Sequence, residues 1–119
     1  MGHIVTARLR WLSRLTGTNE VIALFPSVID TKTLAADVAD MENRWVEYLN
    51  ELDDLELERE TQWTTDEGQR LRWIVEGILT HIHGHTCYHR GQFAQLVAAL
   101  GVKAVDTDYL FWAKLEPID

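Results

Sequence analysis

Apolar residues recur every three or four positions along two stretches of the first half of the chain, a period typical of amphipathic helices. The first stretch ends at Gly17, a natural residue just past a helix end. The second follows Thr31 and Thr33, either of which is a suitable N-cap. The two seams consist of Ile4, Val5, Leu9, Trp11, Leu12 and Leu15, and of Leu34, Val38, Met41, Trp45, Leu49 and Leu52. The pattern predicts helices over residues 2–16 and 33–53.

The remaining segments have different signals. "TNEVIALFPSVIDTK" contains Pro26 and no sustained period, which indicates a connection with a short helical turn around residues 21–24. "TQWTTDEGQRLRW" alternates around "DEG" and favours a hairpin with Gly68 in the left-handed region, the competing interpretation being a helix that begins at Asp66. Residues 74–100 again show a helical period, closed by Gly101. We expect the apolar "DTDYLFW" that follows to pack back on the helices.

Composition narrows the class of protein. A chain of 119 residues with 46% hydrophobic and 25% charged residues predicts a single folded domain over residues 1–119. The net charge of −8 disfavours nucleic acid as a partner, because that affinity depends largely on Lys and Arg. The lone Cys87 excludes an intramolecular disulfide, and no apolar run reaches the ~20 residues of a membrane span. We therefore expect a cytoplasmic location and no membrane partner.

Four of the five histidines fall within "HIHGHTCYHRGQ", and helical phase separates them. His85 and His89 lie within the stripe that Ile74, Ile78, Ile82, Phe93, Leu96 and Leu100 define on the last predicted helix. His81 falls on the flank of this stripe. His83 points to the opposite side, which predicts a surface residue.

A His-x-x-x-His pair on one inward face can bind a single ion, because imidazole is a ready ligand for Zn, Ni, Cu or Fe. Buried histidines that are satisfied by hydrogen bonds remain the alternative. A catalytic metal site usually has three protein ligands and an open position, so a third ligand would have to come from elsewhere. The remaining histidine, His3, shares a helix face with Ala7, Arg10 and Arg14, and periodicity alone predicts that it is exposed.

At "HIHGHTCYHRGQFAQLVAALGVKAVDTDYLFW" the sequence resembles the DinB family of small metal-binding four-helix bundles, the DinB/YfiT-like group. The resemblance rests on the spaced histidines, "YHRGQ", "ALG" and "TDYL" in this order. It extends to "GHIVTARLRWLSRLTG" and to "TTDEG", and so covers nearly the whole chain.

The resemblance implies a metal site of three histidines, which are His3, His85 and His89 in this sequence. It thereby outweighs the phase argument that places His3 at the surface. His81 matches a position that is often histidine, and it is a candidate to support the ligands by a hydrogen bond or to line the pocket. Tyr88, Arg90 and Gln92 match the motif as well, although packing and hydrogen bonds on the helix surface are the favoured explanation for Arg90 and Gln92.

One departure concerns the start of the chain. Similar proteins have a helix before the one that supplies the first ligand, whereas this sequence begins at Met1 where that helix should have ended. The expected fold is therefore an all-α up-down bundle, shortened at its N-terminus, with a small hairpin before the last long helix. An open apolar seam is costly in water, so either the chain is a shortened version of a longer product or a second subunit covers the seam, as in a homodimer.

The expected function is divalent metal binding at an open three-histidine site, with Zn, Ni or Fe as the ion. Three neutral ligands leave the ion its full positive charge, which lowers the pKa of a water or a thiol and suits hydrolysis or thiol transfer. The resemblance implies that some similar proteins are transferases or isomerases that use small bacterial thiols. The alternatives are a non-catalytic metal-binding module, for instance one involved in stress response, and a dimeric interaction protein with structural histidines.

Overall fold

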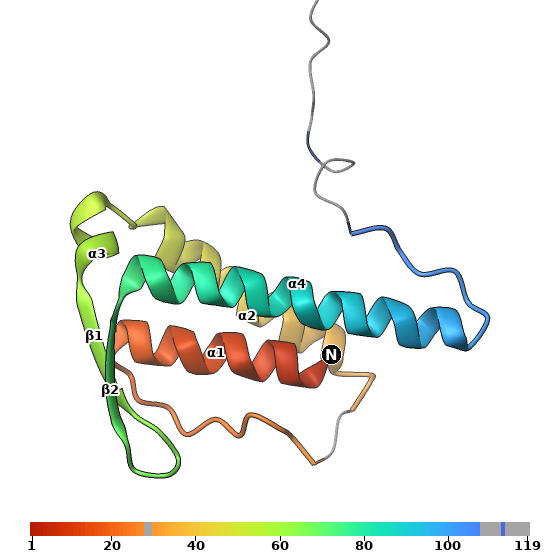
Figure 1. Cartoon of the computed structure of the whole chain (residues 1–119), viewed down its shortest axis with the longest axis horizontal. Helices are drawn as coiled ribbons and strands as arrows, with labels where there is room; N and C mark the ends of the chain where they lie inside the picture. The colour runs from red at the N-terminus through yellow and green to blue at the C-terminus, as the bar shows by residue number, and fades with distance from the viewer. Residues whose placement is uncertain (28–29, 108–112, 114–119) are drawn as a thin grey trace, which may run out of the picture. The chain divides into compact units, whose positions relative to one another are not determined.

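The computed structural model describes residues 1–27, 30–107 and 113. Its helices are α1 (Gly2–Thr16), α2 (Leu34–Asn50), α3 (Asp54–Glu58) and α4 (Val75–Ala99), and its strands are β1 (Glu60–Thr64) and β2 (Arg70–Ile74). The chain forms two compact units, residues 1–85 and residues 86–119. The first unit contains every element up to the middle of α4, and the second begins with the remainder of that helix (Figure 1). None of the helices in the described ranges is long and apolar enough to cross a membrane.

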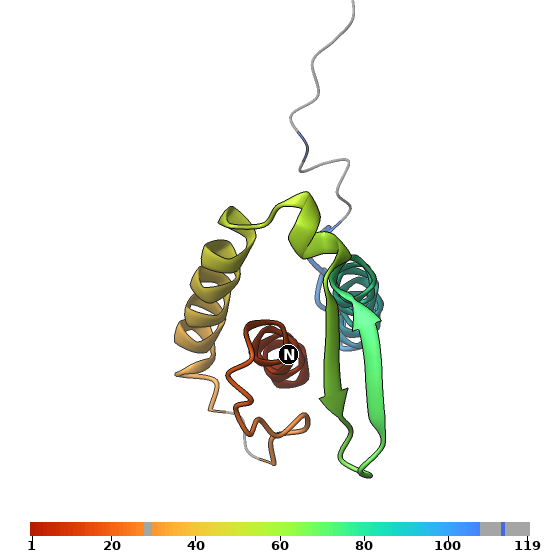
Figure 2. The same cartoon turned by 90° about the vertical axis from the view of Figure 1, so that its left-hand side faces the viewer.

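In the first unit, α1 lies between α2 on one side and the β1–β2 hairpin on the other, with the first turns of α4 above the hairpin (Figure 2). The core joins apolar side chains from α1, α2 and α4, because each of these helices presents one apolar stripe to its neighbours. This core consists of Val5, Leu12, Leu15, Met41, Trp45, Val75, Ile78 and Ile82. Ile78 and Val75 are fully buried, so α4 is anchored in the unit at its N-terminal end.

The structure confirms the predicted first helix, whose C-cap Gly17 has a φ of 72°. The hairpin is also confirmed: β1 and β2 pair antiparallel from Glu60 opposite Ile74 to Thr64 opposite Arg70, and Gly68 has a φ of 84°. The competing helix at Asp66 is therefore wrong. The chain is mostly helical with a small hairpin, as expected, so a strictly all-α description is too narrow.

Three other predictions are corrected. The second helix does not reach residue 53, because the Asp53 carboxylate accepts a hydrogen bond of 2.7 Å from the Glu56 amide and caps a new short helix, α3. Ile74 does not belong to the stripe of the last helix, since it ends β2 and its side chain is exposed. Residues 21–24 form no helical turn. The expected packing of "DTDYLFW" falls mainly on residues 108–112, which lie outside the described residues.

Arg59 joins the ends of three elements in the first unit. Its guanidinium donates to the carbonyl of Leu15 at 2.8 Å, to Thr61 Oγ1 at 2.8 Å and to both carboxylate oxygens of Glu56 at 2.7 Å. The Leu15 carbonyl lies in the last turn of α1, where carbonyls have no partner within the helix. Tyr48 also donates to Glu56 Oε1 at 2.7 Å, so α1, α2, α3 and β1 are connected through one arginine and one carboxylate.

We expect this network to make stability fall in acid. The hydrogen bond from Arg59 is the main cause that holds the pKa of Glu56 below its ordinary value near 4.5. A pKa lowered by folding gives stability that is present above the unfolded value and is lost as the pH falls through the folded value. Urea unfolding at pH 6 and at pH 3 should therefore show less acid destabilisation in Arg59→Met, which should also lose about 1–2 kcal/mol at pH 6. The matched control is Arg72→Met, whose exposed pair with Glu60 is 3.5 Å long; equal behaviour of the two variants would contradict the prediction.

Candidate metal centre

His3 lies in the first turn of α1 and is held there by the connection that follows the helix. Its Nδ1 is 2.8 Å from the carbonyl oxygen of Leu24. A carbonyl oxygen can only accept, so Nδ1 carries the hydrogen and the lone pair of the neutral ring is on Nε2. Phe25 stacks on the ring with centroids 4.4 Å apart and an interplanar angle of 2°. The connection thus fixes both the tautomer and the orientation of His3.

The prediction that His3 is exposed is wrong, because this face of α1 is covered. Ala7, on the same face, is 5% exposed, and His3 itself is half-buried. Thr6 Oγ1 also donates to the Leu24 carbonyl, at 2.9 Å. An irregular segment therefore buries a helix face that carries no apolar stripe, which helical periodicity does not detect.

His85 comes from α4 and meets His3 within the first unit. The two ring centroids are 5.2 Å apart, with the ring planes at 66° to each other. His85 is half-buried and lies one turn after Ile82, which belongs to the core. The anchored N-terminal part of α4 therefore positions His85 against α1.

His89 follows His85 by one turn of the same helix and has its own supporting contacts. Its Nδ1 is 2.9 Å from Gln92 Oε1, and the amide nitrogen of Gln92 donates to the Tyr88 hydroxyl at 3.0 Å. In this arrangement Nδ1 of His89 donates to the amide oxygen, so its lone pair is on Nε2, as in His3. A hydrogen bond on the far ring nitrogen is the usual means by which proteins orient a metal-binding histidine.

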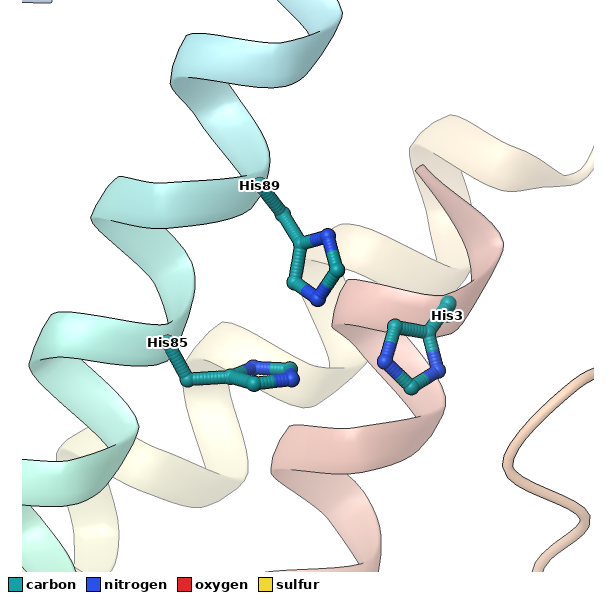
Figure 3. Close-up of side chains that lie close together, drawn as sticks. All are labelled: His3, His85 and His89. Atoms are coloured by element: carbon teal, nitrogen blue, oxygen red, sulfur yellow. The ribbon is translucent and has the colours of Figure 1, made fainter.

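His3, His85 and His89 form a group that could hold a metal ion. One ring nitrogen from each lies within 4.8 Å of the others, and all three residues are half-buried. Figure 3 shows the three rings directed toward a common point, one from α1 and two from α4. Nitrogen ligands bind zinc at about 2.0–2.1 Å, which places them about 3.3 Å apart around a tetrahedral ion. Small side-chain rotations would close the difference, so the donor set fits a divalent ion.

The group contains imidazoles alone. Within the described part of the chain, this is the one group of three or more His, Cys, Asp or Glu residues whose ligand atoms lie close enough together to hold a metal ion. Neutral ligands cancel none of the charge of a divalent ion, and imidazole suits Zn, Cu, Fe and Ni.

The remaining motif residues lie in different surroundings. His81 is exposed, with its ring centroid 5.6 Å from that of His85 and 5.6 Å from that of Trp11. His83 is exposed, as the phase of the helix predicted. Arg90 donates to Cys87 Sγ at 3.3 Å, which is a local contact on its own helix.

Sequence reasoning missed two partners of the histidines. The carbonyl of Leu24 has no sequence signature, because every residue carries a backbone carbonyl. Gln92 matches the motif without a role as a partner of His89, yet its spacing of three from His89 is a usable signal, since residues three apart are neighbours on a helix.

Comparison with known proteins gives one match. The model of the DinB family matches residues 1–119, which is the whole chain. No curated protein and no solved structure matches the chain significantly.

Proposed function

Because the chain belongs to the DinB family, we propose that His3, His85 and His89 are the protein ligands of a divalent metal ion. The observation that supports this most is the meeting of His3 and His85, which are 82 positions apart in the sequence and come from different helices. The Leu24 carbonyl on Nδ1 of His3 adds support, since a hydrogen bond to one ring nitrogen is the usual means of orienting a metal-binding histidine. We further propose that Gln92 and Tyr88 orient His89, that His81 lines the approach to the ligands, and that Arg90 stabilises the helix beside them.

We propose thiol transfer as the reaction, in preference to hydrolysis. A bound divalent ion would supply Lewis-acid chemistry by lowering the pKa of a thiol or a water that it binds. A thiol, with an ordinary pKa of about 8.5, needs much less help to lose its proton than water does, with a pKa of 15.7. The chain's own residues would then bind, orient and partly shield the thiol.

The alternative function is metal binding without catalysis. The half-buried ligands suit either possibility, because both need the same three nitrogens. The two differ in exchange at the open position: a catalytic site admits a small thiol as an additional ligand, whereas a closed structural site does not. Absorption spectra of the cobalt-substituted protein, recorded with and without 2-mercaptoethanol, would separate them.

Elemental analysis tests the metal site directly. Protein purified without an affinity tag or added metal is expected to contain about one equivalent of Zn, Ni or Fe per chain. A parent protein that contains no divalent metal and takes up none in equilibrium dialysis would overturn the proposal.

A homodimer is the proposed assembly. Phe93 and Leu96 in the last turns of α4 and Leu100 just after it are spaced by three and four residues, and all three side chains are exposed. An apolar stripe of this kind is costly in water, and a second copy of the chain would cover it. Light scattering is expected to give twice the mass of one chain, and Leu96→Glu is expected to give the monomer mass. A monomeric parent protein would contradict the proposal.

A further inference from the structure

A second site lies in the first unit, beside α1. A pocket of about 490 Å³ opens between α1, the segment 19–24 and the start of the hairpin loop. This is within the size range of small-molecule sites. Its lining combines the apolar residues Leu24 and Trp63 with Arg10 and Arg14.

The charged residues that line this pocket differ in whether they have an ion-pair partner. Arg10 donates hydrogen bonds to both carboxylate oxygens of Asp66. Glu20, which also lines the pocket, accepts from Arg44 at 2.7 Å. Among the described residues, Arg14 has neither a hydrogen-bond acceptor nor an ion pair, although it is half-buried. Arg14 is therefore the one cation of the pocket wall that forms no hydrogen bond or ion pair with these residues, and Asp66 acts on it only through its charge.

The Arg14 guanidinium is nevertheless held in a defined orientation. It lies over the ring of Trp11 at 4.7 Å and over that of Trp63 at 5.4 Å. The two indoles contact each other edge to face with centroids 5.0 Å apart. Stacking fixes the plane of a guanidinium and leaves its N–H groups at the rim available, so little conformational entropy is lost when they bind a carboxylate. Burial, followed by the charge of Arg10, lowers the pKa of Arg14, and the nearby carboxylate of Asp66 opposes this only in part.

We propose that this pocket binds a small molecule that carries one carboxylate on an apolar body. Arg14 pairs with the carboxylate through the bidentate geometry that guanidinium and carboxylate share. Trp63 and Leu24 contact the apolar body. One unpaired cation in a chain of net charge −8 suits a single carboxylate and not a polyanion.

The pocket adjoins His3 through Leu24. This residue lines the pocket, and its carbonyl accepts from His3. His3, Arg10 and Arg14 share one face of α1, and Arg14 lies eleven residues, or about 16 Å, beyond His3 along the helix. A carboxylate held by Arg14 would thus anchor one end of an extended substrate whose other end reaches His3. This role in catalysis rests on the proposed function, whereas the binding itself requires no metal.

The test compares 4-phenylbutyrate with its uncharged amide, 4-phenylbutyramide, on the full chain in the presence of EDTA. Calorimetry gives the affinities, and the indole N–H signals of Trp11 and Trp63 in ¹H–¹⁵N NMR spectra locate the ligand. We expect the carboxylate to bind at least about tenfold more tightly than the amide and to shift both signals. Equal affinities, or no shift of either signal, would overturn the proposal.

Variants separate the guanidinium's role in binding from its role in folding. Arg14→Gln should abolish the preference for the carboxylate, Arg14→Lys should retain part of it, and the exposed Arg72→Gln should leave it unchanged. An unchanged preference in a folded Arg14→Gln protein would overturn the assignment to Arg14. If Arg14→Gln does not fold, the comparison of the two ligands on the parent and on Arg14→Lys still decides the question. His85→Ala should bind 4-phenylbutyrate like the parent, so failure of the metal site and failure of this pocket give different results.

Discussion

His85→Ala is expected to lose the divalent ion, and His83→Ala is expected to keep it. Both variants remove one imidazole from the same helix, so they change helix propensity and charge alike. His85 belongs to the group whose nitrogens lie within 4.8 Å, whereas His83 does not. Loss of a supporting residue already costs about 10–100-fold in metal affinity, and loss of a direct ligand should cost more than about 100-fold.

The measurement is metal content by elemental analysis after dialysis, followed by competition with a chelator of known affinity. His3→Ala should behave like His85→Ala, because both contribute a nitrogen to the same group. If His3→Ala retained the parent's affinity while His85→Ala lost it, the site would consist of the α4 pair alone. Equal metal content in His83→Ala and His85→Ala would contradict the assignment of the ligands.

Ile78→Ala is expected to lower the free energy of unfolding by about 2–5 kcal/mol. Ile78 is 0% exposed and lies in the core cluster with side chains from α1 and α2. Removing three carbons there loses the transfer free energy and leaves a cavity that rigid neighbours fill poorly. The same residue anchors the part of α4 that carries His85, so the variant should also bind metal more weakly.

Urea unfolding followed by tryptophan fluorescence measures this loss, with Leu55→Ala as the control. Leu55 is 79% exposed, so its truncation should change stability by no more than about 0.5 kcal/mol. A similar small effect in both variants would mean that Ile78 does not lie in the folding core.

The spacing of apolar residues predicted the helix and the hairpin whose formation depends on residues close together in the sequence. The first helix has the predicted bounds, and its end at Gly17 follows from the positive φ that glycine adopts easily. The hairpin follows from alternation on both sides of Gly68. The wrong assignment of Ile74 to the last helix has a local cause as well. An apolar residue between a strand and a helix fits the last position of the strand as well as the first turn of the helix.

The sequence by itself also determined the pair His85 and His89, since residues four apart on one helix are neighbours in any fold that keeps the helix. The position of His3 was decided by the tertiary structure, because the segment 19–25 crosses the face of α1 that lacks an apolar stripe. An irregular segment buries a helix face through backbone carbonyls and isolated side-chain contacts. Neither kind of contact produces a periodic pattern of apolar residues in the sequence. The same holds for the pocket at Arg14, where residues from α1, the connection and the hairpin meet through contacts between positions far apart in the chain.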